Sequence, residues 1–252
     1  MKIIISPAKK MNSDSDLFAA ESRPVFAGDA ARLVAQLREM DAAALKALWQ
    51  CSDKLAAENI ARLAALDVER AQTPALFAYE GLQYQHIAPT VLSADALDYL
   101  RAHLRILSGL YGVLRPFDAV MPYRLEMQAR LAVDGAQNLY DYWGARLYEA
   151  LDEADGTIVN LASNEYARAI TPHLAAGDRF VTLRFGEVID GRFKQKATLA
   201  KMARGEMVRY MAENGVDDLA ALADFDALGF RFAPDLSDAA TMTFVKEDTD
   251  GH

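Results

Sequence analysis

Hydrophobic residues recur three and four positions apart along much of the chain, the spacing that places them on one face of a helix. Between residues 28 and 65 this pattern predicts three helices. Asp41 and Ser52 separate them, because these side chains can accept hydrogen bonds from the free N–H groups of a first helical turn. The same spacing predicts helices over residues 93–107, 138–151 and 199–211.

Shorter apolar runs predict strands between these helices. Residues 2–5 and 157–161 are predicted to be buried strands, and residues 74–84 a strand or an extended loop. An Asp-Gly step at Asp190 separates residues 180–188 from 192–196, which predicts a hairpin. Because the elements interleave without a regular βαβ repeat, we expect a mixed α/β (α+β) fold in which residues 1–252 form a single domain with a central sheet and flanking helices.

Charge is distributed unevenly along the chain. The formal net charge is −9, but residues 213–252 carry ten acidic and two basic side chains, and we expect this acidic tail to fray from about residue 244. Residues 179–209 carry eight basic and three acidic side chains. The negative net charge of the whole chain argues against binding to nucleic acid. The basic segment either suits an anionic partner or is a solvated helix face.

Several classes of function lack a signature. No apolar run is long enough to span a membrane, and we expect a cytoplasmic protein, with a monomer favoured. Cys51 is the only cysteine, so a disulfide within the chain is excluded. The four histidines show no metal-ligand spacing and no nucleotide-binding glycine motif occurs, so we predict neither a metal nor a cofactor.

Two polar stretches stand out near the predicted strand ends. Ser6 and Lys9 have the S-x-x-K spacing of a serine nucleophile, but a turn or an anion-binding loop explains them as well. Asn160, Ser163 and Glu165 follow the strand at 157–161, at a position where open sheets commonly bind ligands, although Ser163 also suits a helix cap. Basic side chains that could join them are those of Lys194, Lys196, Lys201 and Arg204.

Gly109-Leu110-Tyr111-Gly112 follows the predicted helix at 93–107. It is either the phosphate-binding turn of a helix-hairpin-helix element, with a second helix beginning at Pro122, or an ordinary helix stop. The basic side chains that flank this turn are Arg101, Arg105, Arg115 and Arg124.

A family resemblance rests on motifs kept in order over residues 1–211. These are IISPAK at 4–9, SDKLA at 52–56, LRILSGLYGVLRP at 104–116, PYRLEM at 122–127, YWG at 142–144, NLASNEY at 160–166 and KMARG at 201–205. Together they resemble the YaaA family of bacterial peroxide stress proteins. In two places the chain departs from that pattern: Gly81-Leu82-Gln83-Tyr84 lacks an acidic residue, and the stretch before Gly205 lacks one basic residue.

The resemblance implies a protein that limits damage by hydrogen peroxide and free iron, with a positively charged cleft, a helix-hairpin-helix element and binding to double-stranded DNA. The positions carried over are Ser6, Lys9, Arg105, Gly109, Gly112, Arg115, Tyr123, Arg124, Asn160, Ser163, Glu165, Lys201 and Arg204.

The sequence leaves two hypotheses for function. A protein that holds the DNA backbone without reading its sequence is favoured. The alternative is an enzyme that acts on a small anionic or nucleotide-like substrate, with Ser6, Lys9 and Glu165 as candidate catalytic residues.

Overall fold

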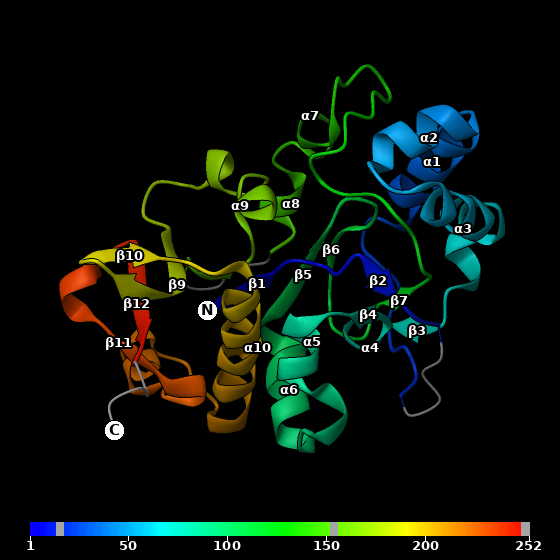
Figure 1. The fold of residues 1–252 in the computed structure, drawn as a ribbon. Helices are drawn as coiled ribbons and strands as arrows, with labels where there is room; N and C mark the ends of the chain where they lie inside the picture. Colours follow the sequence, from blue (N-terminus) through cyan, green and yellow to red (C-terminus); the bar gives the residue numbers. More distant parts are fainter. Residues whose placement is uncertain (14–17, 152–155, 248–252) are drawn as a thin grey trace.

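The computed structural model describes residues 1–13, 18–151 and 156–247 (Figure 1). At its centre is β1 (Lys2–Ile5), whose three isoleucines are fully buried. Strands β5 (Leu104–Ser108) and β8 (Thr157–Leu161) flank β1 on opposite sides, and both run parallel to it. An apolar run with β-branched side chains is typical of a strand covered on both faces, which explains why the predictions at 2–5 and 157–161 are confirmed.

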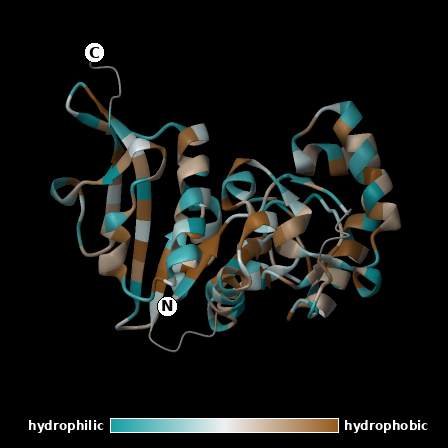
Figure 2. Ribbon diagram, turned by 90° about the horizontal axis from the view of Figure 1, so that it is seen from below, coloured by the Kyte–Doolittle hydropathy of each residue, from teal (hydrophilic) through white to brown (hydrophobic). Residues whose placement is uncertain are grey.

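The sheet extends in both directions from this centre. Beyond β5 lies the antiparallel β6 (Gly112–Leu114), and beyond β8 lie β9 (Arg179–Ile189), β12 (Thr241–Lys246) and β11 (Phe230–Phe232). β10 (Arg192–Lys194) forms the predicted hairpin with β9. Figure 2 shows the hydrophobic strands in the middle of the molecule and hydrophilic residues on the outer helices and loops. The mixed α/β class is thereby confirmed.

Helices pack around this sheet (Figure 1). α10 (Ala197–Asn214) contacts α5 (Leu82–Ile87), α6 (Ala94–His103) and β9. α1 (Ala27–Arg38), α2 (Ala42–Trp49) and α3 (Asp53–Ala65) form a separate group, and the predicted caps Asp41 and Ser52 accept hydrogen bonds from the first turns of α2 and α3. Two short ladders pair β2 (Lys10–Met11) with β4 (Tyr79–Glu80), and β3 (Thr73–Pro74) with β7 (Ala119–Val120).

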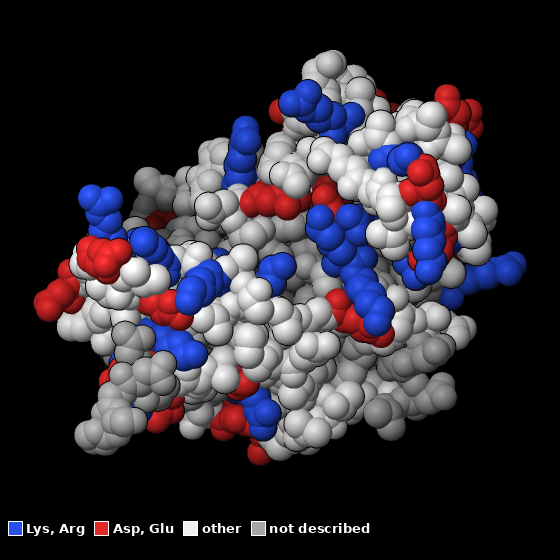
Figure 3. All heavy atoms as spheres, viewed as in Figure 1, with Lys and Arg blue, Asp and Glu red and all other residues white. Residues whose placement is uncertain are grey.

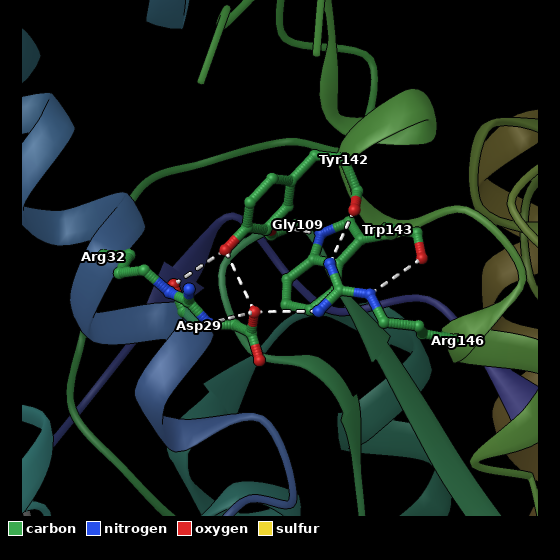
Figure 4. A network of polar contacts seen from close by, with 6 residues as sticks. All are labelled: Asp29, Arg32, Gly109, Tyr142, Trp143 and Arg146. Carbon is green, nitrogen blue, oxygen red and sulfur yellow. Dashed lines mark hydrogen bonds and ion pairs between the residues drawn. The ribbon is translucent and has the colours of Figure 1, made fainter. Parts of the chain in front are cut away.

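A polar network joins the first helix of that group to the rest of the molecule (Figure 4). Asp29 in α1 accepts hydrogen bonds from Arg146 at 2.8 Å, from Arg32 at 3.0 Å and from Tyr142 at 3.2 Å. Beside it, Trp143 donates a hydrogen bond of 3.1 Å to the carbonyl oxygen of Gly109. The residues 142–146 therefore tie α1 to the turn between β5 and β6.

The helix-hairpin-helix prediction is wrong. The helix that starts after Ser93 ends at His103, and residues 104–108 form β5, so the glycine turn at 109–112 joins two strands rather than two helices. Residues 121–126 form neither helix nor strand, so the expected second helix at Pro122 is also absent. Leucines at 104 and 107 fit helical spacing, but a short buried run fits a strand equally well, and pairing with β1 decides the outcome.

Three other predictions need correction. Gly144, at φ 52°, divides the helix expected at 138–151 into α7 (Leu139–Trp143) and α8 (Arg146–Glu149). Residues 74–84 contain α4 (Ala75–Ala78) and the start of α5 as well as short strands, because tertiary pairing overrides their strand propensity. Residues 244–246, which the sequence assigns to a frayed tail, lie in β12.

Candidate functional site

A pocket of about 460 Å³ opens beyond the carboxyl ends of β1 and β8. The chain places β5 and β8 on opposite sides of β1, and open sheets bind ligands where the strand order reverses in this way. Of the predicted site residues, the lining includes Ser6, Lys9, Tyr123, Arg124, Ser163, Glu165, Lys201 and Arg204. The structure thus brings together side chains from four separate stretches of sequence.

Ser6 and Ser163 meet at the floor of this pocket. The Ser6 hydroxyl accepts a hydrogen bond of 2.8 Å from the main-chain N–H of Ser163 and lies 3.2 Å from the Ser163 hydroxyl. Ser163 precedes α9 (Asn164–Ala167), but its side chain makes no capping bond, contrary to the predicted cap. The Ser6 hydroxyl is therefore bonded to the main-chain N–H and the hydroxyl of Ser163, and no basic group activates it as a nucleophile among the described hydrogen bonds.

Basic side chains outnumber acidic ones in the pocket lining by five to three. Lys9 lies 2.8 Å from Glu126, Arg124 lies 2.9 Å from the same carboxylate, and Lys10 pairs with Glu80. Figure 3 shows blue and red side chains interspersed around the hollow of this face. The pocket carries an excess of positive charge, much of it already paired.

Arg204 differs from these paired cations. It projects from α10, and burial lowers the pKa of its guanidinium. Its Nε atom is buried without a hydrogen-bond partner, and within the described ranges no side chain forms an ion pair with it. Lys201 lies one helical turn earlier on α10, is exposed and also lines the pocket.

Glu165 is the corresponding unpaired acid. Burial raises the pKa of its carboxyl group, and the nearby Glu126 carboxylate adds to this increase. One of its oxygens accepts a hydrogen bond of 3.2 Å from the main-chain N–H of Gln128. No basic side chain in residues 1–13, 18–151 or 156–247 lies within ion-pair distance of it.

Tyrosines form one wall of the pocket. Tyr84 donates a hydrogen bond to the carbonyl oxygen of Ser6, and Tyr123 shares hydrogen bonds of 2.9 Å with Tyr79 and 2.6 Å with Ser108. Burial raises the pKa of Tyr123 to about 12. With these hydroxyl groups already bonded, the tyrosines offer mainly ring surface.

Other predicted site residues lie outside the pocket lining. The side chain of Asn160 bonds Thr182 and the N–H of Ala162 within the sheet, and Arg105 is buried against main-chain carbonyls. Arg115 is exposed beside the turn at Asp118. Gly109 and Gly112 pack against neighbouring atoms of the protein. Lys194 and Lys196 lie on the β9–β10 side, where Lys196 pairs with Glu187 at 2.7 Å.

Sequence reasoning missed part of the lining, namely Lys10, Glu80, Gln83, Tyr84, Glu126 and Tyr166. Glu126 lies within the PYRLEM motif beside Arg124 and could have been found from that position. Gln83 and Tyr84 lie in the stretch where the chain departs from the family pattern, which is the signal for their place near the site, although the extended segment expected there is the helix α5.

The described residues contain neither a metal-binding cluster nor a membrane-spanning helix. No group of three or more His, Cys, Asp or Glu side chains there could hold a metal ion. In the same residues, every helix is too short or too polar to cross a bilayer.

Comparison with known proteins identifies the family. The family model described as Peroxide stress protein YaaA matches residues 1–236. The chain belongs to the YaaA family. It is 50% identical over 248 residues to a UPF0246 protein of Pediococcus pentosaceus, covering 98% of this chain and 99% of that protein. A UPF0246 protein of Lactiplantibacillus plantarum is also 50% identical, over 97% of this chain and 99% of its own.

A third UPF0246 protein, from Desulfitobacterium hafniense, is 48% identical over 98% of both chains. The similarity to these relatives spans nearly the full length of each, and the family model at residues 1–236 includes every segment that lines the pocket. The resemblance stated from the motifs is confirmed, and the family description supports a role in peroxide stress.

Proposed function

We propose that the protein acts in peroxide stress by binding a phosphate-bearing ligand in the pocket beyond β1 and β8. The observation that carries the proposal is the buried guanidinium of Arg204, which has no anionic partner within the described residues. Taking a charge out of water is costly unless another charge compensates it. A bound phosphate group would supply that compensation and accept hydrogen bonds from the guanidinium fork.

The size of the pocket favours a small ligand over a duplex. About 460 Å³ falls within the range of sites that enclose small molecules and cofactors. The Glu80, Glu126 and Glu165 carboxylates lie in the same lining and would repel an extended run of DNA phosphates. The contradicted helix-hairpin-helix element no longer supports a backbone-binding surface.

Calorimetric titration with inorganic phosphate and pyrophosphate tests the proposal. We expect binding to the unchanged protein, and loss of that binding in Arg204→Gln. Arg209→Gln is the matched control, because Arg209 lies on the same helix and its partner is Glu213, outside the pocket. Equal binding by Arg204→Gln and the control, with both folded, would reject the pocket assignment.

DNA is a second candidate, favoured by exposed lysines near the pocket. Lys201 lies at the pocket, and Lys194 and Lys196 lie on the neighbouring stretch after β9. In this alternative, double-stranded DNA lies across the face of the protein that carries the pocket, and one of its phosphates contacts Arg204. The bound protein then covers the DNA backbone and limits its oxidation by iron. Because bound cations displace counterions, affinity should fall steeply as salt rises.

A salt series separates the two candidates. For DNA binding, replacing Lys201, Arg204 and Arg124 with alanine should reduce the slope of log affinity against log salt by roughly one for each lost contact. Cleavage of plasmid DNA by ferrous ion and peroxide should then be slowed by the unchanged protein and less by the variant. An unchanged slope would show that DNA does not bind at this pocket, and it would not affect the proposal of a small phosphate ligand.

A further inference from the structure

We propose that the ligand of this pocket is a phosphate monoester that also carries hydroxyl groups, such as a sugar phosphate or a nucleotide, with its phosphate at Arg204 and its hydroxyls at Glu165. This inference rests on the proposed function and extends it by naming both ends of the ligand.

Two groups of opposite charge, Arg204 and Glu165, line one pocket without pairing. The remaining cations of the lining show that pairing is available, since Lys9 and Arg124 share Glu126 and Lys10 pairs with Glu80. Arg204 and Glu165 nonetheless have no salt-bridge partner in the described residues. A fold that leaves Arg204 without an anionic partner, and Glu165 with main-chain hydrogen bonds but no ion pair, has each available for a different part of a bound molecule.

Each charged end of the pocket selects a different chemical group of the ligand. Arg204 and Lys201 project from the same face of α10, and together they suit a group with about two negative charges. The whole lining has two more basic than acidic residues, which matches a phosphate monoester at neutral pH better than a carboxylate. Glu165 accepts main-chain hydrogen bonds from Gln128 and Met127, and the remaining lone pairs of its carboxylate can accept hydrogen bonds from a ligand, as acidic residues do from ribose hydroxyls.

The pocket has room for more than a phosphate between these charged ends. A pocket of about 460 Å³ is much larger than a phosphate ion requires, so the ligand has a body as well. Leu82, Leu125 and the ring of Tyr84 supply apolar lining, and the hydroxyl of Tyr84 is already bonded to Ser6. A sugar ring or a base with polar edges fits such a surface.

Titrations with ribose 5-phosphate, AMP, phenyl phosphate and inorganic phosphate test the inference. Phenyl phosphate is a monoester without hydroxyl donors. We expect ribose 5-phosphate or AMP to bind roughly tenfold more tightly than phenyl phosphate, which is the effect of a hydrogen bond to a charged acceptor. The AMP and ribose 5-phosphate arms distinguish a nucleotide from a sugar phosphate.

Glu165→Gln should remove most of this preference while phenyl phosphate still binds. Glu187→Gln is the control, since Glu187 pairs with Lys196 and lies outside the pocket lining. If all phosphates bind alike and Glu165→Gln changes nothing, the assignment of Glu165 is overturned and the phosphate proposal stands. If no phosphate compound binds the folded protein, both proposals fail.

Discussion

Gly205 packs directly against the main-chain carbonyl oxygen of Gln83, so that α10 and α5 approach each other without an intervening side chain. A methyl group at position 205 would overlap this oxygen and would lie 2.7 Å from Cβ of His86. Gln83 lines the pocket from α5, and Arg204 precedes Gly205 on α10. The close approach of the two helices therefore positions the unpaired guanidinium.

Gly205→Ala should destabilise the protein by about 1–3 kcal/mol, because a main-chain carbonyl cannot move aside as a flexible side chain can. Urea denaturation measures the change. The control is Gly28→Ala in α1, where nothing lies within 4 Å of the added methyl group. That variant should be neutral or more stable by up to about 1 kcal/mol, since alanine favours helix. Equal effects at both positions would show that the helix contact is looser than described.

Arg204→Met should leave the ligand-free protein as stable as the unchanged protein or more stable by about 1–2 kcal/mol, since it removes a buried cation and keeps a side chain of similar length. Phosphate binding should be lost in the same variant. Arg209→Met is the comparison, because Arg209 is ion-paired with Glu213 on the same helix. A loss of more than about 1 kcal/mol in Arg204→Met would indicate a structural role instead.

The network around Asp29 makes a pH-dependent contribution to stability. Burial alone would raise the pKa of Asp29, but the hydrogen bonds from Arg146 and Tyr142 and the charges of Arg146 and Arg32 lower it overall. A carboxyl group whose pKa is lower in the folded state stabilises the fold above its unfolded pKa of about 3.9. This contribution is lost as the pH falls through the lower, folded value.

Asp29→Asn should therefore reduce the free energy of unfolding by about 1–2 kcal/mol at pH 7, and the difference from the unchanged protein should shrink below about pH 4. Denaturation curves from pH 7 to pH 3 measure it. Asp53→Asn breaks the exposed pair with Lys46 and should change stability by no more than about 0.5 kcal/mol. A pH-independent difference for Asp29→Asn would mean that its charge is unimportant.

Local pattern was sufficient where the chain forms elements from contiguous residues. The isoleucines of β1, the run at 157–161 and the caps Asp41 and Ser52 all carry their own signals, and the structure agrees with each. Ser6 and Ser163 follow the two strands, so their meeting at one sheet edge follows from parallel pairing.

Long-range pairing could not be predicted in the same way. Lys9 and Glu126 are far apart in sequence, so no local pattern shows that Lys9 is compensated and Arg204 is not. Asn160 was expected beside Ser163 at the site, but its amide bonds Thr182 on the neighbouring strand. At 104–108 the leucine spacing suits helix and strand equally, and only the partner strand β1 selects between them.

Substitutions in the glycine turn at 109–112 test whether this turn only closes the β5–β6 hairpin or also contacts phosphate. Gly112 has φ +72°, and a methyl group there would lie 2.9 Å from the side chains of Leu147 and Phe26 and 3.1 Å from Trp143. Gly112→Ala should reduce the free energy of unfolding by about 1–2 kcal/mol because of the left-handed backbone, and by about 1–3 kcal/mol more because of overpacking. Gly135→Ala isolates the first cost, because Gly135 has φ +86° and nothing lies within 4 Å of its added methyl group.

Denaturation of both variants, followed by titration of whichever remains folded with pyrophosphate and with DNA, separates the two roles. If the turn only closes the β5–β6 hairpin, Gly112→Ala loses more stability than Gly135→Ala, and the folded fraction binds any phosphate ligand as before. If the turn instead contacts phosphate, Gly112→Ala weakens binding in the folded protein with a stability close to that of Gly135→Ala. The three side chains packed around Gly112 favour the first outcome, because a methyl group added there would lie within 3.1 Å of each of them and overpacking would add to the backbone cost.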